Sequence, residues 1–88
     1  MNAIVNKPIK MKITKCYAGK YQVCVDELPL PLFVSHRLNE NCEPSGEWNM
    51  FYGSDGWMGI YSSKKGCIDS IKRMVQNGSI KYYCGIQG

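Results

Sequence analysis

Alternating apolar and polar residues predict two strands near the start of the chain. The alternation runs over residues 9–14 and again over residues 21–25. A period of two is typical of a strand with one face in a core and the other in solvent. Ala18 and Gly19 lie between the two segments and form a turn signal, so the segments are expected to pair as an antiparallel hairpin.

The register of this hairpin depends on the length of its loop. A loop over residues 18–20, with a glycine at its centre, places the apolar residues of both strands on one face. This register pairs Ile13 with Val25 on the core face. It also pairs Lys12 with Asp26 on the opposite face.

Three more strands are predicted in the middle of the chain. Residues 28–31 contain two prolines, which lack N–H donors, so they form an extended connection into a strand over residues 32–38. A polar, acidic loop over residues 39–46 follows. Two aromatic strands, over residues 48–52 and 57–61, then flank a turn rich in glycine, which is a strong hairpin signal.

One helix is predicted after these strands. Ser62 and Ser63 are natural N-caps, and Asn77 with Gly78 forms a stop signal. Between them, apolar residues recur at helical spacing and form a stripe that would lie on the sheet. The stripe consists of Cys67, Ile68, Ile71, Met74 and Val75. The exposed side carries Lys65, Asp69, Lys72 and Arg73.

The final segment, residues 80–86, alternates again and is expected to be a closing strand. The predicted fold class is therefore α+β, an antiparallel β-sheet of five to six strands with one α-helix (about 63–77) packed on one face. A chain of 88 residues with 44% apolar residues has room for one core, so residues 1–88 are expected to form a single domain.

Composition and motifs limit the cellular location and the chemical activity that we expect of the protein. No apolar run approaches the roughly 18 residues of a membrane span, and lysines from Lys7 onward interrupt any signal-peptide core. We therefore expect a cytoplasmic protein with no membrane partner. It contains no Gly-rich phosphate loop and no paired carboxylates in a catalytic setting, so we expect no enzymatic activity, no catalytic residues and no cofactor.

The five cysteines show no metal-binding pattern, because no C-x-x-C pair occurs and His36 is the only histidine. We therefore expect no metal and no disulfide, and largely buried, reduced thiols. A Cys–His36 nucleophile pair is a weaker alternative to a structural role for this histidine. The cysteines are Cys16, Cys24, Cys42, Cys67 and Cys84.

Charge is sorted into blocks along the chain. Residues 1–20 hold five lysines and no acid, residues 21–56 carry a net charge of −5, and residues 57–88 return to +4. Such blocks suggest a two-signed surface that meets a polyanion or a charged partner. Lys64 and Lys65 lie in the first helical turn, where the helix dipole disfavours cations, so a bound phosphate would explain them. The alternative is that the lysines only keep the protein soluble.

Aromatic residues of the hairpin provide the second candidate surface. Trp48, Met50 and Tyr52 are expected to share a face with Trp57 and Tyr61. These rings either stack bases, as in single-strand binders, or belong to the core. Together with the lysines they define the candidate residues for binding a partner or nucleic acid. These are Lys10, Lys12, Lys64, Lys65, Lys72, Arg73, Trp57 and Tyr61.

One segment, residues 48–74, carries a resemblance over about a third of the chain. Its motif residues are Trp48, Asp55-Gly56-Trp57, Tyr61-Ser62-Ser63-Lys64-Lys65, Ile68 and Ile71. They resemble the strand, "S-K-K" and helix unit of many small phage and prophage proteins. This resemblance implies a viral or prophage accessory protein of the counter-defence type. Such a protein binds and inhibits a host or defence protein or ribonucleoprotein, as anti-CRISPR proteins and inhibitors of toxin ribonucleases do, in the host cell cytoplasm. We expect this chain to do so through its basic face. The alternative is a regulatory protein that binds RNA or DNA directly. Either would be a monomer or a homodimer.

Overall fold

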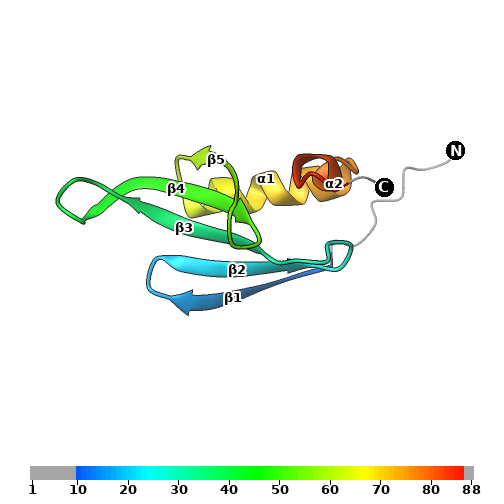
Figure 1. Ribbon diagram of the computed structural model, residues 1–88, viewed down its shortest axis with the longest axis horizontal. Helices are drawn as coiled ribbons and strands as arrows, with labels where there is room; N and C mark the ends of the chain where they lie inside the picture. The colour runs from blue at the N-terminus through cyan, green and yellow to red at the C-terminus, as the bar shows by residue number, and fades with distance from the viewer. Residues whose placement is uncertain (1–9, 87–88) are drawn as a thin grey trace, which may run out of the picture.

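The computed structural model describes residues 10–86, whose five strands form one antiparallel sheet (Figure 1). Each strand pairs with its neighbours in sequence, so the order in space is β1-β2-β3-β4-β5. The α+β class and the antiparallel sheet are as predicted. The strands are β1 (Met11–Tyr17), β2 (Lys20–Val25), β3 (Leu32–Leu38), β4 (Pro44–Tyr52) and β5 (Gly56–Tyr61).

Helix α1 (Lys64–Gln76) has the limits that its sequence signals predict. The side chain of Ser63 caps its start by accepting a hydrogen bond of 2.9 Å from the backbone N–H of Gly66. Asn77 is the C-cap residue. A capped helix with one apolar stripe is stable only when that stripe is buried, and here it packs on β3, β4 and β5.

The core lies between α1 and one face of the sheet. Val34 of β3, Met50 of β4 and Ile71 of α1 are fully buried, and they are the centre of the contact. The remaining buried residues extend this layer along β2 and toward the end of α1. They are Val23, Val25, Leu28, Leu32, Cys67, Ile68, Met74 and Ile80.

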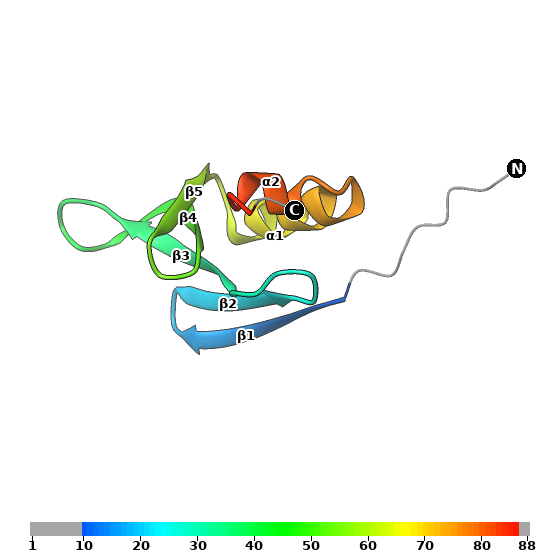
Figure 2. The same cartoon turned by 45° about the vertical axis from the view of Figure 1, so that its right-hand side comes forward.

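The predicted closing strand is wrong, because this segment forms a second, short helix, α2 (Ile80–Tyr83), that lies against α1 (Figure 2). Gly78 has a φ of 80°, and the N–H of Ser79 donates to the carbonyl of Met74, so the chain reverses at the end of α1. Ile80 and Cys84 are then one helical turn apart, and both contact the core. The segment therefore forms a helix, in which apolar residues four apart share a face, and not a strand, in which residues two apart do.

The predicted register of β1 and β2 is also wrong. The turn has two residues, with Tyr17 opposite Lys20, and a β-bulge between Lys15 and Tyr17 takes up the extra residue. The bulge keeps the apolar residues of both strands on one face in spite of the shorter turn. Gly19 has a φ of 90°, and a Cβ atom there would collide with the His36 ring.

The register places Ile13 opposite Val23 and Lys12 opposite Cys24, so the expected Ile13–Val25 and Lys12–Asp26 pairs do not form. Ile13 faces the helix side of the sheet, but α1 packs on β3 to β5 and leaves β1 at the edge. Ile13 is consequently 45% exposed. Residue 9, the predicted start of this strand, lies outside the described residues.

The acidic loop is shorter than predicted, because β4 begins at Pro44, which lies opposite Leu38. Only residues 39–43 form the turn. The side-chain oxygen of Asn39 accepts hydrogen bonds from the backbone N–H groups of Asn41 and Glu43, at 2.9 and 3.0 Å. Hydrogen bonds to the first residue of the turn therefore hold it closed. The hairpin of β3 and β4 extends beyond α1 (Figure 1).

We expect Ile71→Ala to reduce the free energy of unfolding by about 2–5 kcal/mol, because it leaves a cavity where α1 meets the sheet. Ile13→Ala is the matched control, since that side chain is 45% exposed. Its cost should stay below about 1 kcal/mol. Urea denaturation followed by circular dichroism measures both. Equal losses for the two variants would contradict this description of the core.

Candidate nucleic-acid interface

A row of aromatic side chains crosses the sheet on the face opposite to α1. Phe33 of β3 lies opposite Phe51 of β4, and Phe51 lies opposite Trp57 of β5. Successive side chains of a strand point to opposite faces, and Leu32 and Val34 are fully buried on the helix side. Phe33 and the rings paired with it therefore point away from the helix.

Trp57 belongs to this row because of a β-bulge in β5. The register shifts between Met50 and Phe51, so Gly59 pairs with Met50 while Trp57 pairs with Phe51. The prediction that Trp57 shares a face with Trp48 and Met50 is wrong for this reason. Trp57 is 58% exposed.

The indole of Trp57 is held in place on the sheet. Its Nε1–H donates a hydrogen bond of 3.1 Å to Oδ1 of Asn49, which is two residues from Phe51 on β4. A ring that is both exposed and fixed loses little conformational freedom when it binds a partner. The hydrogen bond thus prepares Trp57 for contact with a flat ligand.

A cation and a further ring extend the row toward the other edge. The Lys20 ammonium lies 5.0 Å from the centroid of the Phe33 ring and 5.9 Å from that of Tyr17. Both distances fall within the range of cation–π attraction. Tyr17 is 62% exposed. We call the surface formed by Tyr17, Lys20, Phe33, Phe51 and Trp57 the aromatic face.

The carboxylates of the chain lie mainly in turns. Glu47 is the only acidic residue within the five strands, and it lies 3.8 Å from Arg37. The acidic block of the sequence therefore does not form an acidic side of the sheet. The remaining acids of that block, in turns or connections, are Asp26, Glu27, Glu40, Glu43 and Asp55.

The two lysines at the start of α1 have partners within the protein. The Lys64 ammonium lies 4.1 Å from the centroid of the Tyr21 ring, and Lys65 pairs with Asp69 at 3.3 Å. These contacts offset the unfavourable position of the cations at the positive end of the helix. A bound phosphate is no longer needed to explain them.

The structure places the other predicted site residues on several surfaces. Lys72 and Arg73 lie exposed on α1, and Tyr61 is half-buried, with its hydroxyl accepting a hydrogen bond from Ser70 at 3.3 Å. Lys10 lies beside β1, and Lys12 lies within it. Lys12 and Trp57 are the predicted residues on the face opposite to α1. They lie on the two opposite edge strands, β1 and β5, and the rings between them, Phe33 and Phe51, are not among the predicted residues.

Those missed residues, Phe33 and Phe51 above all, carry a recognisable signal. Phe33 is out of phase with the apolar residues Leu32 and Val34 of the same strand, and Phe51 is out of phase with Met50. A large ring on the polar phase of a strand is a candidate for an exposed platform. Phe33 and Phe51 can be assigned to the exposed side of the sheet only once it is known which side is buried under α1.

Other chemistry in the described chain is limited. No group of three or more His, Cys, Asp or Glu side chains among residues 10–86 is arranged to hold a metal ion. The His36 ring lies 5.8 Å from that of Trp48 and covers Gly19, so this histidine contributes to packing. None of the described helices is long and apolar enough to cross a membrane.

Comparison of the chain with protein-family models, with curated proteins and with solved structures gives no match. The aromatic face combines the exposed rings of Tyr17 and Trp57 with the half-buried rings of Phe33 and Phe51. The Trp57 indole is fixed by its hydrogen bond, and the Lys20 ammonium lies beside Phe33.

The cysteines divide into two groups, which corrects the expectation that they are largely buried. Cys16, Cys24 and Cys42 are exposed, whereas Cys67 is buried and Cys84 is half-buried. Burial raises the pKa of the Cys67 thiol and of the Cys84 thiol to about 11. Desolvation disfavours the thiolate, which is the reactive form.

Native protein treated with iodoacetamide at about pH 8 should be alkylated first at Cys16, Cys24 and Cys42. Cys67 and Cys84 should react slowly until the pH approaches their raised pKa of about 11 or the protein unfolds. Mass spectrometry of peptides at successive times measures the order. Rapid alkylation of Cys67 in the native state would contradict its burial, and fewer than five labelled thiols after denaturation without reductant would reveal a disulfide.

Proposed function

We propose that this protein is a non-enzymatic accessory protein that binds single-stranded nucleic acid through its aromatic face. The observation that carries the proposal is the row of Phe33, Phe51 and Trp57 on the side of the sheet opposite to α1. The role is cytoplasmic, in the host cell if the chain is encoded by a phage.

The spacing of the rings suits unpaired bases. Neighbouring strands lie about 4.8 Å apart, so the three rings span about 10 Å across the sheet. Unpaired bases expose their flat faces to such rings, whereas the bases of a duplex are stacked on one another. Among the described residues, no ring pair in contact joins Phe33, Phe51 and Trp57 to each other. The three rings are therefore not stacked on one another. Lys20 lies over the Phe33 ring, and Trp57, which is 58% exposed, is the most exposed of the three rings.

The charges beside the rings favour a polyanion. Lys20 lies against two of the rings, and Lys12 lies on the same side of the sheet. Glu47, the acidic residue of the strands, is paired with Arg37. Phosphates of a strand stacked on the rings would meet these ammonium groups. The net charge of +4 adds a favourable long-range term.

Trp57→Ala should weaken binding of a short fluorescein-labelled oligothymidylate by about 1–3 kcal/mol, because it removes the indole on which one base stacks. Tyr82→Ala is the matched control, since that ring is 79% exposed but lies on α2. Its affinity should equal that of the wild type. Fluorescence anisotropy measures both. Equal affinities for wild type and Trp57→Ala, or no binding of the wild type to single-stranded RNA or DNA, would contradict the proposal.

Binding should also weaken with salt in a way that depends on Lys20. The logarithm of the affinity is expected to fall with the logarithm of the salt concentration by about 0.7 for each phosphate that a cation neutralises. Lys20→Gln should make this slope shallower by about that amount. Lys81→Gln on α2 makes the same change of charge and should leave the slope unchanged. Equal slopes for the two variants would place the phosphates elsewhere.

A second candidate is inhibition of a host or defence protein or ribonucleoprotein, in the manner of anti-CRISPR proteins. It is favoured by Lys72 and Arg73, which are exposed and form no salt bridge with a described residue. Trp57 would serve here as a protein-contact residue, since exposed tryptophans are common at the centres of interfaces. In this role the protein remains inert toward bare nucleic acid and binds only its protein target.

The double substitution Lys72→Glu and Arg73→Glu separates the two candidates. It should abolish capture of a protein target from a host lysate if the helix surface docks on an acidic partner, while the fold stays intact because both residues are exposed. The affinity for the oligonucleotide should fall only by the amount that the change in net charge causes. Unchanged capture by the variant would exclude the helix surface as the docking site.

A further inference from the structure

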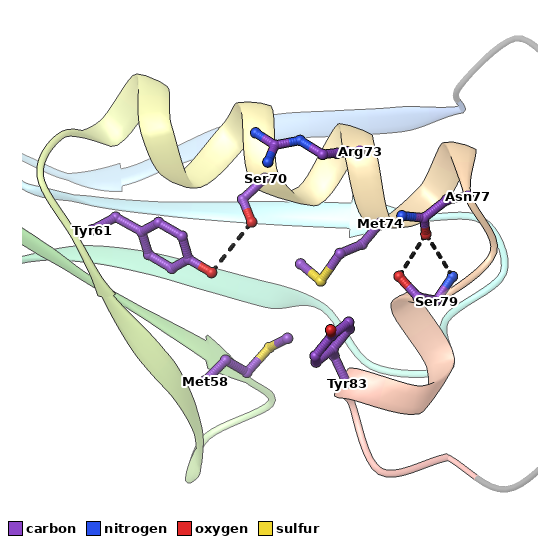
Figure 3. A pocket seen from close by; sticks show the side chains of 8 residues that line it. All are labelled: Met58, Tyr61, Ser70, Arg73, Met74, Asn77, Ser79 and Tyr83. Atoms are coloured by element: carbon purple, nitrogen blue, oxygen red, sulfur yellow. Dashed lines mark hydrogen bonds between the residues drawn. The ribbon is translucent and has the colours of Figure 1, made fainter.

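A cavity of about 330 Å³ lies between β5, α1 and α2 (Figure 3). It is on the helix side of the sheet, whereas the rings of the aromatic face point to the other side. Its size is at the lower end of the range for sites of small molecules. Helix α2 forms the third wall of the cavity. A closing strand in place of this helix would not form it.

Three groups that line the cavity keep free hydrogen-bond donors, on Tyr61, Asn77 and Arg73. Ser70 Oγ donates to the Tyr61 hydroxyl at 3.3 Å, which leaves the phenol hydrogen of Tyr61 free. Oδ1 of Asn77 accepts from the N–H and the hydroxyl of Ser79, at 2.9 and 2.5 Å, which leaves the amide NH₂ of Asn77 free. The cavity therefore offers hydrogens to a ligand.

The third donor is the guanidinium of Arg73, which is permanently charged and forms no salt bridge with a described residue. None of the described residues that line the cavity is acidic. A site with free donors, one fixed positive charge and no carboxylate selects for an anion. A guanidinium binds the planar or branched oxygens of carboxylates and phosphates especially well.

The other walls are apolar and suited to a flat ring. Met58 and Met74 point toward the same space, and Tyr83 closes it from α2 (Figure 3). Methionine sulfur is polarisable, adapts its shape and makes favourable contacts with aromatic rings. A ring that enters this space would lie beside the Tyr83 ring.

We propose that this cavity binds a small aromatic anion. The flat ring lies against Met58, Met74 and Tyr83, and the carboxylate or phosphate meets Arg73 with help from the Tyr61 hydroxyl. A nucleoside monophosphate and an aromatic carboxylate share this chemistry. The site is separate from the aromatic face, so either proposal can fail alone.

Adenosine 5′-monophosphate and 4-hydroxyphenylacetate are suitable probes, with uncharged adenosine as the reference. Titrations followed by NMR of the methionine methyl groups should show shifts at Met58 and Met74. The phosphate should bind about tenfold more tightly than adenosine, because the charged hydrogen bond to Arg73 is lost in the neutral compound. Tighter binding of the monophosphate or of the carboxylate identifies which anion the site prefers.

Arg73→Gln should weaken binding of the preferred probe by about tenfold, and Tyr61→Phe by a few-fold. Lys72→Gln makes the same change of charge at the next residue, which does not line the cavity, and should alter affinity by less than about twofold. Thermal melts establish that each variant is folded.

Several results would overturn the proposal. One is the absence of methyl shifts at Met58 and Met74 with either probe at millimolar concentration. Another is an equal loss of affinity in Lys72→Gln and Arg73→Gln, which would indicate general attraction by charge. Shifts confined to the Trp57 indole signal would place the nucleotide on the aromatic face and leave the cavity without a ligand.

Discussion

The structure depends on one constraint, which is that a single main helix must bury the apolar face of a five-stranded sheet. The stripe of α1, centred on Ile71, meets Val34 and Met50 and forms the core. A helix covers only one face of a sheet, and α2 packs against α1 rather than on the other face. The described chain thus leaves the opposite face, with its aromatic rings, at the surface.

Two β-bulges decide which rings reach that surface. The bulge in β5 changes the phase of the strand, so Trp57 pairs with Phe51 and turns away from the helix. The bulge in β1 does the same near Tyr17, which comes to lie near Lys20. Bulges are common where a strand must redirect a side chain. Without these irregularities the face would hold fewer rings, and the indole of Trp57 would compete for space under α1.

The charged side chains of the described residues mainly make contacts with near neighbours. Lys64 and Lys65 are explained by contacts with Tyr21 and Asp69, and the acids of the middle block are spread over the turns. Lysines on β1 also hinder pairing of this edge strand with another chain. The cations with the clearest capacity to meet a ligand are therefore those beside exposed rings or beside a cavity. Lys20 is the example on one side of the sheet, and Arg73 on the other.

The sequence by itself determined the parts of the fold whose signals are local. The limits of α1 follow from Ser63, Asn77 and the stripe between them. The strand β3 follows the connection that contains two prolines, and the β4–β5 hairpin follows from two aromatic runs beside a glycine-rich turn. Tertiary structure decided the β1–β2 register, the side on which Trp57 lies, and the helical state of residues 80–83. Bulges change the phase of a strand without a clear sequence signal. An alternating run also contains the four-residue spacing of a helix, so only packing against α1 selects between the two.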